Sequence, residues 1–377
     1  PKIFLIKFIT VSVEPLDLRK IRIAIIGCGR ISKNHIKSIF IHKNLCELVA
    51  ICDNNLKRLD EALSTIQEFK KEFSILETNI NKYISDRHLF EDIRNKDLNV
   101  DLIVLTTPSG LHPKQTIAAA NLGINVCTEK PMATTWEDGV EMVDVCNRNK
   151  VKLFVVKQNR FNKTISLVKN QIKKNRFGKI GLVVVNVFWQ RPQSYYDQDE
   201  WRGTLNLDGG ALMNQASHYV DLLNWLIGSV ESVNASISTI ARDIEAEDTA
   251  VLKIKWKNGA LGTMAVTMIT YPHNIEGSIT ILGDKGTVKI GGKAVNKIEE
   301  WHFSDQDEDD KLVENASYET NSVYGFGHPV YYENMLKTLR GESEPICSGE
   351  DGLKSLELLI ASYRSSKTGL EIKLPLK

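Results

Sequence analysis

The feature that most constrains the fold is a regular alternation, from Ile21 onwards, of short apolar runs with segments of helical periodicity. The apolar runs are rich in β-branched residues and too short for helices, so each is interpreted as a buried strand. We expect strands at residues 21–26, 47–52, 101–105, 124–128 and 152–156, with helices at 30–41, 55–71, 113–122 and 135–149. Strands alternating with helices predict a parallel sheet covered on both faces, the doubly wound α/β architecture of a Rossmann domain.

The periodicity changes after about Lys157. We expect a long strand at 181–189, a helix at 209–226 ended by Gly228, and then one strand after another between residues 230 and 303. Strands that follow strands, with an Asn258-Gly259 turn between two of them, predict a large, open, mostly antiparallel sheet. An acidic solvated loop at 304–310 and helices near 329–340 and 349–366 complete the chain.

These patterns divide the chain into three regions. Residues 1–20 are an N-terminal extension, residues 21–157 the Rossmann domain, and residues 158–377 a second α/β domain for substrate binding and oligomerisation, whose terminal helices could pack back on the first. The extension is apolar and basic, but Lys7 interrupts its apolar stretch and no small-residue cleavage site follows, so we expect no signal peptide.

Composition narrows the class of protein. The chain has 48 basic and 47 acidic residues, a net charge of +1, which argues against a nucleic-acid partner. No apolar run reaches the roughly 18 residues that cross a bilayer. None of the six cysteines forms a CxxC pair, which is typical of buried, reduced thiols in the cytoplasm rather than of a metal site.

A dinucleotide fingerprint follows the first expected strand. Gly27-Cys28-Gly29-Arg30-Ile31-Ser32 is a GxGxxG motif with serine in the third position. Gly27 permits the tight turn, and Gly29 lets the backbone approach a pyrophosphate at the helix N-terminus. Asp53 ends the next strand, where an acid binds the ribose hydroxyls and repels a 2′-phosphate, so NAD is favoured over NADP. Arg58 lies too far along the helix for the usual phosphate clamp, and the alternative is a glycine turn with a strand-capping acid.

Two further strand ends carry candidate residues. Thr106, Thr107, Pro108 and His112 follow one strand at its carboxyl end, where ligands bind in open α/β sheets, although His112 could simply begin a helix. Glu129-Lys130-Pro131 follows the next strand. Lys130 could donate to a substrate hydroxyl and lower its pKa, and the alternative is a surface ion pair.

A polar pair lies on the helix expected at 209–226. Asn214 and His218 are four residues apart and therefore share a face. His218 is the natural general base, since imidazole titrates near neutral pH. Gly209-Gly210 at the helix start would allow another backbone to approach closely. We predict Lys130, His218 and Asn214 as the catalytic residues, against the alternative of a structural histidine.

In this order, the motifs GCGRIS, Asp53, TTPSGLHP, EKPMA and GGALMNQASHYVDLLNWLIG resemble the Gfo/Idh/MocA oxidoreductases, and SITILGDKGTVKI resembles their C-terminal sheet. The resemblance covers the chain from about Ile21 to its end. It implies a Rossmann domain plus an open-faced α/β domain, with Lys130 and His218 in the active site. Many members carry aspartate where this chain has Asn214, an amide that cannot accept a proton, so His218 or Lys130 must act as the base.

The segments WQRPQSYYDQDEWRGT and DGGALMNQASHYVDLLNWLIG narrow the resemblance to the branch that oxidises UDP-2-acetamido-2-deoxy-glucuronic acid at C3 in bacterial surface-polysaccharide (lipopolysaccharide) synthesis. It implies NAD, that UDP-sugar as substrate and a 3-keto product. Arg160, Arg191 and Arg202 would suit the diphosphate, and Tyr195, Tyr196 and Trp201 would cover the sugar, uracil or nicotinamide. Alternatives are a dehydrogenase of UDP-GlcNAc, a free sugar or inositol, and a non-catalytic NAD-binding regulator.

The resemblance thus completes two sets of expected site residues. The expected cofactor-binding residues are Gly27, Gly29, Arg30, Ile31, Asp53, Thr106, Thr107, Pro108, His112, Glu129, Lys130, Gln158, Trp201 and Arg202. The expected substrate-binding residues are Lys130, Arg160, Tyr195, Tyr196, Asn214 and His218. The family commonly forms dimers or tetramers, and the segment ALGTMAVTMI carries apolar residues on both faces of its strand, so we expect a homo-oligomer that uses the open sheet, a tetramer by preference.

Overall fold

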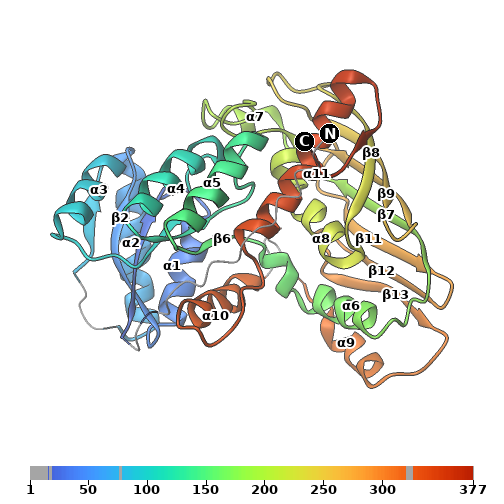
Figure 1. Cartoon of the computed structure of the whole chain (residues 1–377), viewed down its shortest axis with the longest axis horizontal. Coiled ribbons are helices and arrows are strands. Elements are labelled where there is room, and N and C mark those ends of the chain that lie inside the picture. Colours follow the sequence, from blue (N-terminus) through green and yellow to red (C-terminus); the bar gives the residue numbers. More distant parts are fainter. Residues whose placement is uncertain (1–15, 17–18, 76–78, 320–325, 377) are drawn as a thin grey trace.

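The structure is a computed structural model that describes residues 16, 19–75, 79–319 and 326–376. The described chain forms two sheets with their own helices, lying side by side (Figure 1). The expected N-terminal extension, residues 1–20, lies almost wholly outside the described residues. Among the helices that are described, none is both long and apolar enough to cross a membrane.

The first sheet is entirely parallel and has the strand order β3-β2-β1-β4-β5-β6. Its strands are β1 (Ile21–Ile26), β2 (Cys46–Cys52), β3 (Asn81–Tyr83), β4 (Leu102–Leu105), β5 (Asn125–Thr128) and β6 (Leu153–Val155). β4, β5 and β6 are buried at every position, since helices cover both faces. The strand order reverses between β1 and β4, and ligands of such sheets bind outside the carboxyl ends at this point. The predicted fold class is confirmed.

The helices of this half are α1 (Ser32–Ile41), α2 (Leu56–Glu72), α3 (Asp86–Asn95), α4 (His112–Asn121) and α5 (Trp136–Arg148). Asn55, Ser85 and Thr135 cap α2, α3 and α5 by accepting a backbone N–H of the first turn. β3 and α3 are absent from the elements expected from the sequence. β3 has three residues, none of them buried, so it carries no apolar run that could be recognised.

The second sheet has eight strands in the order β13-β12-β11-β7-β10-β9-β8-β14. They are β7 (Ile180–Phe188), β8 (Val230–Ser238), β9 (Thr249–Trp256), β10 (Leu261–Thr267), β11 (Glu276–Gly283), β12 (Gly286–Gly291), β13 (Lys297–Phe303) and β14 (Ile372–Lys373). Every pair is antiparallel except β7 with β10, which confirms the mostly antiparallel prediction. Burial alternates along β9, because helices cover one face and leave the other open.

The covering helices are α6 (Lys163–Lys173), α8 (Ser217–Ile227) and α11 (Gly349–Thr368), visible beside the sheet in Figure 1. Short helical segments are Ser109–Leu111, Gln158–Phe161, α7 (Gln193–Tyr196), Glu308–Leu312 and α9 (Val313–Ala316). α10 (Gly327–Leu339) packs on α1 of the Rossmann half, where Tyr332 Oη lies 2.8 Å from His35 Nδ1. α11 contacts both α5 and β8, so the C-terminal helices join the two halves.

Two local predictions are wrong. The helix expected at 209–226 begins instead as a π-helical turn, Ala211–Gln215, before α8, because Glu247 accepts the backbone N–H of Ala211 with its carbonyl and that of Leu212 with its side chain. Gly228 does end the helix, with φ of 111°. The acidic stretch at 304–310 is not simply solvated, since its carboxylates bind Lys174 and Arg176.

Candidate active site

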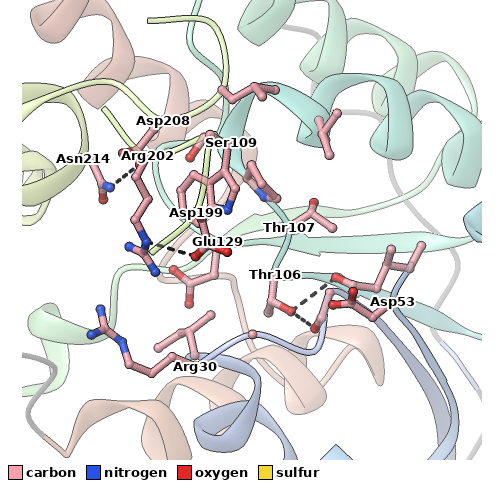
Figure 2. Close-up of a pocket in the computed structure, with 18 of the residues that line it drawn as sticks. Arg30, Asp53, Thr106, Thr107, Ser109, Glu129, Asp199, Arg202, Asp208 and Asn214 are labelled. Carbon is pink, nitrogen blue, oxygen red and sulfur yellow. Dashed lines mark hydrogen bonds and ion pairs between the residues drawn. The ribbon is translucent and has the colours of Figure 1, made fainter. Parts of the chain in front are cut away.

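A cavity of about 680 Å³ lies between the two halves, at the carboxyl ends of the parallel strands (Figure 2). Many of the predicted site residues line it: Gly27, Gly29, Arg30, Ile31, Asp53, Thr106, Thr107, Pro108, Glu129, Lys130, Arg191, Tyr195, Trp201, Arg202, Asn214 and His218. The Rossmann half thus contributes its strand-end loops, and the second half contributes the loop before α8 and α8 itself.

The glycine loop after β1 fits closely against β4. Gly27 has φ of +98°, and a Cβ there would lie 2.6 Å from the carbonyl carbon of Thr106, so only glycine fits. Gly29 faces open space, since an added Cβ would meet nothing within 4 Å. Asp53 joins this loop to the end of β2 by accepting the backbone N–H groups of Cys28 at 2.7 Å and Asn55 at 2.8 Å.

Lys130 crosses from the Rossmann half to the second half. Its ammonium donates to the backbone oxygen of Asn214 at 2.8 Å and to the side-chain Oδ1 of the same residue at 3.2 Å. Burial lowers the pKa of Lys130 to about 8, against the opposing influence of Glu129 and Asp208. A fraction of this amine is therefore neutral near physiological pH.

His218 lies on the opposite wall and contacts Gln158, with 3.3 Å between the two Nε2 atoms. Burial, and then the positive charge of Lys130, hold the pKa of His218 well below its usual range. Its Nδ1 has no hydrogen-bond partner among the described residues. The imidazole is thus neutral at working pH.

Sequence reasoning missed Asp208, which also lines the cavity and is 2% exposed. It accepts a hydrogen bond from the backbone N–H of Gly203 at 2.7 Å. It also accepts one from Nδ2 of Asn214, and Figure 2 draws this pair. Burial raises the pKa of Asp208 to about 6. Asp208 opens the segment DGGALMNQASHYVDLLNWLIG, but the sequence assigns it no role, because its partner Asn214 is six positions away across an irregular turn.

Arg58 also lines the cavity, although its position on α2 had suggested that it lay too far from the cofactor. Its guanidinium pairs with Asp199 of the second half, and Asp199 in turn accepts from Nε of Arg202 at 3.1 Å. The arginine is therefore neutralised by a carboxylate from the other side of the cavity.

Comparison with known proteins identifies both halves. Residues 21–157 match the model described as "Oxidoreductase family, NAD-binding Rossmann fold", and residues 169–374 match "Oxidoreductase family, C-terminal alpha/beta domain". The chain belongs to the Gfo/Idh/MocA oxidoreductase family. Its predicted membership is confirmed, and the cofactor of its first domain is NAD.

Members of the family with solved structures resemble the whole chain. The WlbA dehydrogenase from Bordetella pertussis, in complex with NADH and UDP-GlcNAcA, is 53% identical with a TM-score of 0.89, covering 96% of this chain and 100% of that one. The WlbA dehydrogenase from Chromobacterium violaceum, in complex with the same ligands, is 50% identical with a TM-score of 0.89, covering 97% and 99%. Myo-inositol 2-dehydrogenase from Thermotoga maritima is 23% identical over 94% of this chain and 98% of its own length.

The residues present fit the NAD of this family. The open space at Gly29 leaves room for a pyrophosphate beside the start of α1, where among the described residues no side chain caps the helix. Each carboxylate oxygen of Asp53 makes one hydrogen bond and keeps a second lone pair for a ribose hydroxyl. Glu129 and Lys130 line the same cavity.

The structure does not bring Arg160 to the cavity, which corrects its expected contact with substrate. The guanidinium is 4% exposed and donates to both carboxylate oxygens of Asp221, from Nε at 2.8 Å and from Nη2 at 2.7 Å. A third donor reaches Asp351 at 3.3 Å. Arg160 therefore anchors α8 and α11 to the segment that follows β6, and Arg191 and Arg202 remain as the predicted phosphate-binding arginines in the cavity.

Three other predicted contact residues lie outside the cavity lining. His112 is fully buried, with its two ring nitrogens 2.9 Å from the backbone oxygen of Thr107 and 3.1 Å from that of Pro131, so it lies between two strand-end loops. Gln158 stands behind His218 and orients its ring. Tyr196 packs edge-on against Tyr195, 5.1 Å between ring centroids, on the side away from the cofactor loops.

Glu129 is held from behind by a buried group. His35 Nε2 lies 2.9 Å from its carboxylate and His328 Nε2 lies 3.8 Å away. Burial opposes ionisation of Glu129, but these two histidines hold its pKa well below the usual value. The other ring nitrogen of His35 lies 2.8 Å from Tyr332 Oη, so the ring is fixed and orients the carboxylate of Glu129.

Proposed function

We propose that the protein uses NAD to oxidise the C3 hydroxyl of UDP-2-acetamido-2-deoxy-D-glucuronic acid (UDP-GlcNAcA) to the 3-keto sugar nucleotide. One observation carries the proposal: Lys130 of the NAD-binding domain and His218 of the second domain line the same cavity, beside the dinucleotide loop. Two relatives at 50% and 53% identity, matched over nearly their full length, were solved with NADH and UDP-GlcNAcA. We assign the reaction to bacterial surface-polysaccharide synthesis, which uses such activated sugars.

The chain supplies the proton chemistry of the oxidation, while bound NAD supplies the two-electron acceptor. The C3 hydroxyl proton must pass to a base as the carbonyl forms. His218 and Lys130 are the two candidate bases. The pKa of His218 is well below the usual value, so its ring is neutral but weakly basic, whereas Lys130 has a pKa of about 8 and is partly neutral. Asn214 cannot take the proton, because an amide oxygen is not a base at this pH.

The charged end of the substrate has candidate partners in the second domain. Arg191 lines the cavity with its Nε bound to Gln215 Oε1 at 3.1 Å, and Arg202 lines it beside Trp201. The planar guanidinium binds phosphate or carboxylate through two parallel hydrogen bonds. We assign the diphosphate to these two arginines, with Tyr195 stacked between them.

The experiment that tests the proposal compares UDP-GlcNAcA with UDP-GlcNAc by NADH absorbance. The proposal predicts a strong preference for the acid, which is the sugar nucleotide bound in both WlbA dehydrogenase structures. Strong preference for UDP-GlcNAc, or turnover of free inositol alone, would move the chain to another substrate class. NADH binding without turnover of any of these sugars would support a non-catalytic regulator.

We also propose that the chain assembles through the open face of its second sheet, as a tetramer in the cytoplasm. Leu182 of β7 and Leu261 of β10 are register partners, 38% and 53% exposed, and Val251 of β9 is 52% exposed. Exposed apolar side chains on adjacent strands are typical of a contact surface. Light scattering of Val251→Glu and Leu261→Glu variants tests this, since both should dissociate. The six cysteines are buried and free, as a reducing compartment requires.

A further inference from the structure

We propose that Asp208 is a positioning residue: its carboxylate holds the amide of Asn214 so that the amide oxygen, and not the nitrogen, faces the ammonium of Lys130. The inference rests on the proposed function for its effect on turnover, but its effect on Lys130 can be measured without substrate. The motif DGGALMNQASHYVDLLNWLIG begins with Asp208, but the sequence alone assigns this residue no role.

The geometry forms one continuous chain of contacts. Asp208 Oδ2 accepts from the backbone N–H of Gly203 at 2.7 Å, and Asp208 Oδ1 accepts from Nδ2 of Asn214. The other end of that amide, Oδ1, accepts from Nζ of Lys130 at 3.2 Å. Figure 2 shows the side chains of Asp208 and Asn214 pointing toward each other.

The polarity of these hydrogen bonds requires a carboxylate at position 208. An ionised carboxylate accepts at both oxygens and donates nothing, whereas an amide accepts at one end only. Asp208 faces two donors, the Gly203 N–H and the Asn214 amide nitrogen. An asparagine at this position can satisfy only one of them, which leaves the Asn214 amide without a fixed orientation toward Lys130.

The charge of Asp208 also acts on Lys130. The charged groups that face Lys130 are Glu129 and Asp208, which favour its ammonium, and Lys157 and Arg191, which oppose it. Those facing Asp208 are Arg202 and Lys130. Loss of the carboxylate therefore lowers the pKa of Lys130. The pH profile moves to lower pH whether Lys130 must be protonated or neutral, so the direction does not depend on which residue is the base.

The same series of hydrogen bonds explains the asparagine at position 214, where many family members have aspartate. In this protein the carboxylate stands at position 208, one hydrogen bond further from Lys130. The Asn214 amide lies between them, accepting from Lys130 and donating to Asp208. Exchanging the two residues preserves every contact, because the amide now at position 208 would accept from Gly203 and donate to the carboxylate now at position 214. The exchange variant Asp208→Asn/Asn214→Asp should therefore recover the turnover that Asp208→Asn loses.

The experiment compares the wild type with Asp208→Asn, Asn214→Asp, the exchange variant, and Asp243→Asn as a control at an exposed carboxylate. Competitive acetylation with trace acetic anhydride, followed by mass spectrometry of the Lys130 peptide, gives the titration midpoint of Lys130 in each protein. NADH binding and thermal unfolding confirm that each variant is folded. Initial rates with UDP-GlcNAcA across the pH range give the second readout.

We expect Asp208→Asn to lower the Lys130 midpoint by about 1 pH unit and the turnover number by about tenfold. The exchange variant should return the turnover number to within about threefold of the wild type, and its Lys130 midpoint should lie at or above the wild-type value, because the carboxylate then contacts Lys130 directly. Asn214→Asp alone should also impair turnover, because two carboxylates then face each other, so its comparison with the exchange variant stands even if Asp208→Asn does not fold.

An unmoved Lys130 midpoint in Asp208→Asn, or an exchange variant no better than either single change, would overturn the proposal. A purely structural role for Asp208 predicts both of those results, since the substituted amide would still accept from Gly203. If the wild type does not oxidise UDP-GlcNAcA, the proposed function fails, but the acetylation midpoints still decide the role of Asp208.

Discussion

Two arginines of the same predicted class should respond in opposite ways to the same substitution. Arg160→Met should destabilise the protein without changing ligand binding, whereas Arg191→Met should weaken substrate binding without destabilising it. Arg160 is 4% exposed and forms a two-point contact with Asp221, which is 2% exposed. Arg191 lines the cavity.

The magnitude follows from the burial of the pair. Removing one partner of a buried ion pair costs about 3–5 kcal/mol, because the other charge stays buried without compensation. Lys157 remains 3.6 Å from Asp221, so we expect the lower end of that range. At about 2–4 °C for each kcal/mol, the unfolding temperature should fall by at least about 6 °C. Loss of charge-assisted hydrogen bonds at Arg191 should raise the KM for the UDP-sugar about tenfold or more.

The pH dependence gives a second check on the same pair. Burial opposes ionisation of Asp221, but Arg160 and Lys157 outweigh it and lower its pKa from 3.8 to about 2. A carboxylate whose pKa is lower in the folded than in the unfolded state contributes its full stabilisation at pH values above the unfolded-state pKa. It loses this contribution as the pH falls toward the folded-state pKa. The difference in unfolding temperature between the wild type and Arg160→Met should therefore be full at pH 7 and shrink between about pH 4 and pH 2.

Circular dichroism against temperature, with NADH affinity and KM measured well below the transition, separates the two effects. An Arg160→Met variant with an unchanged unfolding temperature and a raised KM would refute the reasoning and return Arg160 to the substrate site. An Arg191→Met variant that loses stability but keeps its affinity for the UDP-sugar would refute the assignment of Arg191 to substrate binding.

Three further substitutions test other parts of the cavity. Lys130→Met should keep NADH affinity within about twofold and reduce turnover at least about 100-fold, and stopped-flow rates close to the wild type would remove Lys130 from the chemistry. Gly27→Ala places a Cβ 2.6 Å from the Thr106 carbonyl carbon, so fluorescence titration should show NADH binding abolished, and normal affinity would contradict the tight-turn role. Asp199→Asn removes the carboxylate that neutralises Arg58, so the ratio of kcat/KM for NADP to that for NAD should rise severalfold, whereas an unchanged ratio would place Arg58 away from the ribose.

The elements that the sequence predicted are the buried ones, whose apolar residues recur with a regular period. β1 has the predicted bounds, 21–26, because a parallel strand covered on both faces is apolar at almost every position, with Arg22 as the exception in β1. β3 has no buried residue and gave no such signal. The π-helical turn before α8 depends on Glu247, more than thirty residues away, so no local pattern could reveal it.

The site residues that the sequence predicted are those at the ends of strands and those that share one face of a helix. Gly27, Asp53 and Lys130 follow buried strands, and the carboxyl ends of such strands meet at one edge. Arg160 and Arg191 are chemically identical residues, and only tertiary contacts distinguish an internal anchor from a cavity residue. Asp208 was missed for the same reason, because its importance lies in the two donors that the fold brings to it.

The most direct test of the central claim is a crystal structure of the protein with NADH and UDP-GlcNAcA bound together. The account predicts that Nζ of Lys130 and a ring nitrogen of His218 both lie within hydrogen-bond distance of the C3 hydroxyl, with C3 against the nicotinamide. A sugar bound with C3 turned away from that pair, or a nucleotide sugar bound outside the cavity, would contradict it.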